Sequence, residues 1–159
     1  MLLHTSSLSP TAHRRSAPEL PARVFSPRRL ITAAGAALAA ALVGVLAIRA
    51  LAVSGQSDTS RFFPLQPASV ISLTVVAVLL ATATCLWLNR ISDRPLATFR
   101  AVALVALLLS FVPDAAIWVT ASFPQTTAAT VVPLMAMHVL VATVCMLALP
   151  RLGQADAGA

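Results

Sequence analysis

Two ionisable side chains, Asp114 and His138, stand out in this sequence because each lies inside a long apolar stretch. A charge at the centre of a bilayer costs about 2.5 to 3.5 kcal/mol on insertion scales, so such residues usually face other helices or a water-filled cavity. The helical rise of about 1.5 Å per residue puts the two side chains about 8 and 12 Å from the same end of their stretches. We therefore predict that Asp114 and His138 meet.

Ser110 extends this candidate site by one helical turn. It precedes Asp114 by four residues, and Trp118 follows Asp114 by four, so the three side chains share a helix face. Pro113 removes a backbone hydrogen bond and frees the carbonyl of Leu109 for another donor. The predicted intramembrane polar site consists of Asp114, His138 and Ser110.

Two kinds of function fit this site. The polar pair fixes how the helices pack, or it relays protons in a small transporter. Hydrogen bonds between membrane helices average about 0.6 kcal/mol, which is less than the insertion cost of an aspartate, although a position in the outer half of the membrane lowers that cost. The sequence favours a non-enzymatic membrane component with a structural pair, and the proton-coupled transporter stays as the alternative.

Two further chemistries are weaker. Met135, three residues before His138, and Cys145 could join His138 as soft ligands of Cu(I). Leu134, four residues before His138 on the same helix face, offers no ligand atom. Ser110 and His138 could form a nucleophile and base, but the glycine-flanked turn that exposes a catalytic serine is missing. The sequence contains no zinc-protease, phosphate-loop or dinucleotide motif. We expect no metal, no cofactor and no enzymatic activity.

The composition decides the class of protein in which these residues sit. Hydrophobic residues make up 58% of the 159 residues and charged residues 10%, against about 25% charged in soluble domains. The mean hydropathy is +0.89. These values predict an all-α bundle of four transmembrane helices, at residues 30–53, 68–88, 101–119 and 130–149, between a disordered arginine-rich tail (1–29) and a short polar tail (151–159).

Small and aromatic residues suggest how these helices are placed. Ala36, Ala40 and Gly44 form one row on the first helix and Ala33, Ala37 and Ala41 a second row, both of which we interpret as packing surfaces. Phe62 and Phe63 are expected to anchor a loop in the membrane interface. Arg49 is expected to extend to that interface, with Asp58 and Asp114 as alternative partners.

Charge predicts the orientation. Nine of the eleven arginines fall in the two tails and the second connection, and only Arg49 and Arg61 fall on the opposite side. By the positive-inside rule both termini are cytoplasmic in an inner (plasma) membrane. A cleaved signal peptide is the weaker alternative, because the first apolar run is too long. Cys85 and Cys145 are expected to be free thiols, and the tail alone is too weak a signal for nucleic-acid binding.

Three motifs suggest a family. They are RPLATFR at Arg94–Arg100, the following AVALVALLLSFVPD, and MAMHVLVATV at Met135–Val144. Across residues 29–151 the sequence resembles a family of small bacterial four-helix membrane proteins known as a domain of unknown function. The resemblance implies four spans, with a polar break in the third and a Met-His pair in the fourth, and no activity. The expected partners are the lipid bilayer and either further copies of the chain or another membrane protein.

Overall fold

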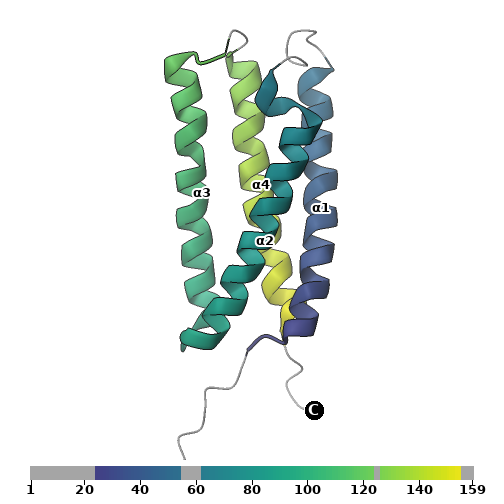
Figure 1. The fold of residues 1–159 in the computed structure, drawn as a ribbon, viewed down its shortest axis with the longest axis vertical. Coiled ribbons are helices and arrows are strands. Elements are labelled where there is room, and N and C mark those ends of the chain that lie inside the picture. Colours follow the sequence, from purple (N-terminus) through teal and green to yellow (C-terminus); the bar gives the residue numbers. More distant parts are fainter. Residues whose placement is uncertain (1–23, 55–61, 124–125, 155–159) are drawn as a thin grey trace, which may run out of the picture.

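The computed structural model describes residues 24–54, 62–123 and 126–154. Within them the chain forms four long α helices: α1 (Pro27–Val53), α2 (Pro67–Ile91), α3 (Pro95–Thr120) and α4 (Ala128–Gly153). A short 3-10 helix, η2 (Phe63–Leu65), precedes α2. The helices run alternately up and down in one bundle (Figure 1). Each is long and apolar enough to cross a membrane, so the four-helix prediction is confirmed and the chain has the form of a multi-pass membrane protein.

Proline and threonine set where the helices begin. Pro27, Pro67 and Pro95 each occupy the first helical position, where the missing N–H costs no hydrogen bond. At the start of α4, Thr127 and Thr130 form a capping box in which each side chain bonds the backbone of the other residue. Because of these residues, each helix begins before the apolar run that it contains.

One of the two small-residue rows of α1 forms the core of the bundle. Ala33, Ala37 and Ala41 are buried in a cluster with residues of α2 and α4, including Cys85 and Cys145. In the other row Ala36 and Ala40 are exposed. Gly44 alone of that row makes a close approach, since a Cβ built on it would lie 2.7 Å from Cδ1 of Leu140 in α4. α1 therefore packs most extensively against α4 through the alanine row.

α3 is the most peripheral of the four helices. Figure 1 shows it at the side of the bundle away from α1, next to α4. Between residues 100 and 120 its one buried residue is Asp114. Because α3 buries little of its surface against the other described helices, the contact at Asp114 is important for holding α3 in its position.

The two ends of the described chain are tied together at one end of the bundle. The backbone N–H and carbonyl of Phe25 bond the side chain of Asn89 at 3.1 and 3.0 Å. The N–H of Ser26 donates to the carbonyl of Gly153 at 3.1 Å. Phe25 is itself buried. The predicted disordered tail therefore needs a correction at residues 24–29, which are ordered, while residues 1–23 lie outside the described part.

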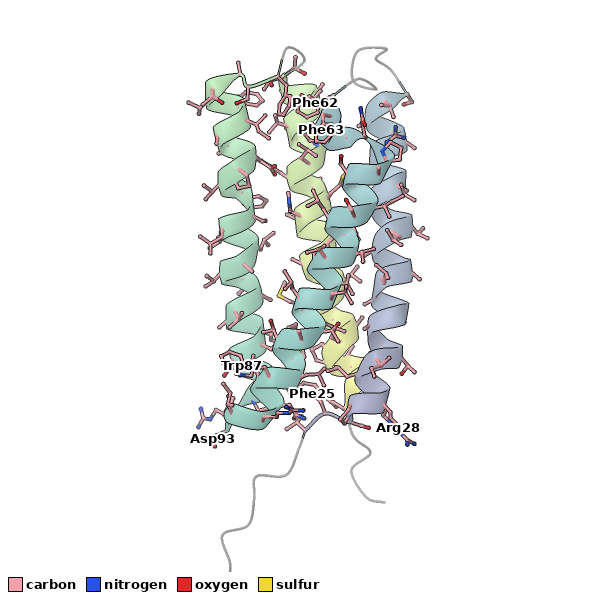
Figure 2. All side chains as sticks on the ribbon, viewed as in Figure 1. Phe25, Arg28, Phe62, Phe63, Trp87 and Asp93 are labelled. Atoms are coloured by element: carbon pink, nitrogen blue, oxygen red, sulfur yellow. The ribbon has the colours of Figure 1, made fainter. Side chains whose placement is uncertain are left out.

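At the other end of the bundle, one aromatic prediction was wrong. Phe62 is buried and packs edge-on against Phe123, with ring centroids 5.5 Å apart, whereas Phe63 is exposed. Figure 2 labels both residues near the top of α2. Phe62 fills the space between the end of α3 and the neighbouring core residues, so only Phe63 is available as an interface anchor.

Candidate functional site

Asp114 and His138 lie in contact between α3 and α4. The Oδ2 atom of Asp114 is 3.0 Å from Nδ1 of His138, which is within the contact distance of an ion pair. Asp114 is 4% exposed, whereas the side chain of His138 is 34% exposed. Two residues that the sequence placed at similar depths on different helices are thus brought together.

The pair is polar in an apolar setting. Both contacting atoms are buried, and among the described residues neither meets the geometry of a hydrogen bond with any partner. The ring of Phe111 stands edge-on to the imidazole with centroids 6.4 Å apart. The short approach of the two groups is therefore the main polar contact of both, and removing either group leaves the other buried without it.

Ser110, the third predicted site residue, does not join the pair. Its hydroxyl donates to the carbonyl of Leu107 at 2.7 Å, within its own helix, rather than to the carbonyl that Pro113 was expected to free. Trp118, one turn beyond Asp114, is 48% exposed. The shared helix face therefore contributes one buried residue, because α3 meets α4 along a narrow line.

Arg49 lies elsewhere. Its Nε donates to the carbonyl of Leu65 at 2.8 Å, where it ties α1 to the C-terminal end of η2. Leu65 precedes α2, so this bond connects the first two membrane helices. Of the two alternative partners, Asp114 contacts His138 instead of Arg49, and Asp58 lies outside the described residues.

The family assignment rests on most of the chain. The model of the family of unknown function DUF6069 matches residues 21–155. The chain belongs to the DUF6069 family. The resemblance to a domain of unknown function is thereby confirmed, and Asp114 and His138 both fall inside the matched region. The chain matches no curated protein and no solved structure.

The sequence did not indicate the cavity beside the pair in this DUF6069 protein. A cavity of about 430 Å³ lies between α2, α3 and α4, and both His138 and Ser110 line it. Its walls come from three helices that are distant in sequence. A periodic apolar pattern cannot distinguish a face that packs tightly from one that leaves space, so no sequence signal was available.

Several side chains with possible ligand atoms border the cavity. Within the described ranges, no three His, Cys, Asp or Glu side chains gather closely enough to hold an ion. Met137, not Met135, lines the cavity with His138 and Cys145. A thioether, an imidazole and a thiol thus border the same space, but the thiol also belongs to the packed core around Ala37.

Proposed function

We propose that this DUF6069 protein is a non-enzymatic component of the bacterial inner membrane in which Asp114 and His138 fasten α3 to α4. The observation that carries the proposal is that Asp114 is the one buried residue of α3 between residues 100 and 120. Lipid tails are as apolar as leucine, so apolar contacts alone give α3 little preference for α4 over lipid. A polar contact supplies that preference.

The energetics support a fastening role. Breaking a buried charge pair by removing one partner typically costs about 3 to 5 kcal/mol, because the remaining group is left uncompensated. The same pair adds only a small net stability over apolar packing. A residue pair with these properties favours the one position of α3 in which both partners meet over positions in which they are separated. A peripheral helix needs such a contact because its apolar packing alone does not fix its position.

A proton-coupled transporter is the second candidate, and one observation favours it. His138 is partly exposed and lines the cavity, so its ring can exchange protons with a guest or with water there. On its other side the ring contacts the buried carboxyl group of Asp114. An imidazole between a buried carboxylate and an accessible space is a common arrangement for proton transfer.

The two candidates separate in proteoliposomes under an imposed pH gradient, with the parent protein compared with Asp114→Asn. If the pair only fastens α3, the parent conducts no protons, and Asp114→Asn lowers thermal stability. If the pair relays protons, the parent conducts and Asp114→Asn abolishes the flux while the protein stays folded. Proton flux in the parent would thus reject the first proposal.

The orientation and partners extend the proposal. The described arginines other than Arg49 belong to the helix ends and the connection on the side of Phe25, where Figure 2 labels Arg28 and Asp93. The positive-inside rule assigns this side to the cytoplasm. The exposed apolar faces of α3 meet the lipid bilayer, a further copy of the chain or another membrane protein.

A further inference from the structure

The cavity between α2, α3 and α4 has the size and shape of a binding site. Its volume of about 430 Å³ falls within the range of about 300 to 1,000 Å³ typical of small-molecule sites. It borders α3 from Phe99 to Ser110, which is about 16 Å at the helical rise of 1.5 Å per residue. That volume spread over that length describes a narrow channel.

The channel is reached from the bilayer. Leu73 and Leu80 of α2 border it and are 64% and 63% exposed, so its rim belongs to the outer surface of the bundle. Most of the remaining lining consists of Ala, Val and Leu side chains. A molecule that enters here must already be dissolved in the lipid.

The hydroxyl groups on the wall have already used their hydrogens. Thr74 donates to the carbonyl of Val70 and Ser110 to that of Leu107, both at 2.7 Å. Thr84, at the far end of the channel, donates to Leu80 in the same way. These oxygens therefore offer only lone pairs to a guest.

His138 supplies the missing donor. A buried pair is most stable without net charge, and an Asp-His pair without net charge holds two protons. Nδ1 faces the carboxyl group of Asp114 at 3.0 Å, so in a pair without net charge one proton belongs to that contact and the second is carried by Nε2. Since His138 lines the cavity and Nδ1 faces Asp114, Nε2–H is the nitrogen donor left for a guest.

We propose that the channel binds an elongated, lipid-soluble molecule whose terminal carbonyl or carboxyl oxygen accepts a hydrogen bond from Nε2–H of His138. Its apolar body would lie along α3 toward Phe99. At about 30 Å³ for each water-sized group, the channel encloses on the order of fourteen non-hydrogen atoms, and the rest of a longer guest would extend past the open rim into the lipid. Fatty acids and quinones share the required chemistry.

The test is equilibrium binding of two radiolabelled probes, lauric acid and a decyl-tailed quinone, to the full chain in nanodiscs. Ala103 lines the channel, and Ala101, two residues earlier on α3, is exposed and does not. Ala103→Trp fills the channel and Ala101→Trp is its matched control. Competition with the alkane of equal length tests the oxygen acceptor without altering His138.

We expect one saturable site per chain for at least one probe. Affinity falls about tenfold or more in Ala103→Trp, stays at the parent value in Ala101→Trp, and the alkane fails to compete. The probe that binds more tightly identifies the source as an acyl acid or a quinone. No saturable binding of either probe, equal binding by both tryptophan variants, or competition by the alkane would each overturn the proposal. The structural role of the pair would be unaffected by these results.

Discussion

At the residue scale, the contact between Asp114 and His138 brings polar side chains of α3 and α4 together in the apolar part of the described bundle. The contact is short and both contacting atoms are buried. Its strength depends on both members being present, because an apolar replacement of one leaves an unsatisfied polar group and replacement of both does not.

This dependence predicts a specific pattern of stabilities. His138→Leu leaves Asp114 buried without its partner and should lower the free energy of unfolding by about 3 kcal/mol. The double replacement of Asp114 and His138 by leucine should recover most of that loss. Unfolding of the purified proteins in mixed micelles measures all three values. Additive losses in the double variant would contradict a direct pair.

Ser110→Ala is the control for this series. The hydroxyl lies one turn from Asp114 but bonds only its own helix, so its removal should change the free energy of unfolding by less than about 0.5 kcal/mol. A loss as large as that of His138→Leu would place Ser110 in the polar site after all.

At the element scale, the two small-residue rows of α1 differ although the sequence presents them alike. Ala37 is fully buried against α2 and α4, whereas Ala36, its neighbour, is exposed. The buried row and Gly44 of the other row set the distance between helix axes. Ala36 and Ala40 are free to face lipid or a further protein.

This difference predicts opposite results for two adjacent substitutions. Ala37→Leu should overpack the α1–α4 contact and lower the free energy of unfolding by about 1 to 3 kcal/mol. Ala36→Leu should leave the monomer unchanged, because its side chain points out of the bundle. Thermal unfolding in detergent compares them. If Ala36→Leu instead dissociates an oligomer, the exposed row is an interface between copies.

At the scale of the whole molecule, both described chain ends lie at the same end of the bundle, joined through Phe25, Asn89 and Gly153. Four helices that alternate in direction bring the two ends to the same side, and the hydrogen bonds join them there. The last turns of α1 and α3 and the first turns of α2 and α4 lie at the opposite end (Figure 1).

Labelling of single cysteines tests the proposed orientation. Cys85 and Cys145 are buried, so Cys85→Ala with Cys145→Ala provides a background without accessible thiols. Arg94→Cys and Ser122→Cys then place exposed thiols at opposite ends of α3. A membrane-impermeant maleimide should label Ser122→Cys in intact cells, and Arg94→Cys only after permeabilisation. The reverse result would invert the topology.

The sequence alone determined the class of the molecule and its most unusual residues. Long apolar runs require helices in lipid, because every backbone polar group must be satisfied within its own segment. The apolar runs located the four spans, although Pro27, Pro67 and Pro95 begin three of the helices earlier than the predicted residues 30, 68 and 101. Asp114 and His138 were identifiable because an ionisable side chain at membrane depth has few acceptable neighbours.

The tertiary structure decided what those rules leave open. The burial of Phe62, the choice between the alanine rows and the cavity beside His138 all depend on how far apart the helices stand and how each is rotated. In a chain that is apolar on nearly every face, hydropathy carries little information about rotation, because lipid and protein accept the same side chains. Contacts such as those of Asp114 and Asn89 supply that information, and they exist only once the helices are assembled.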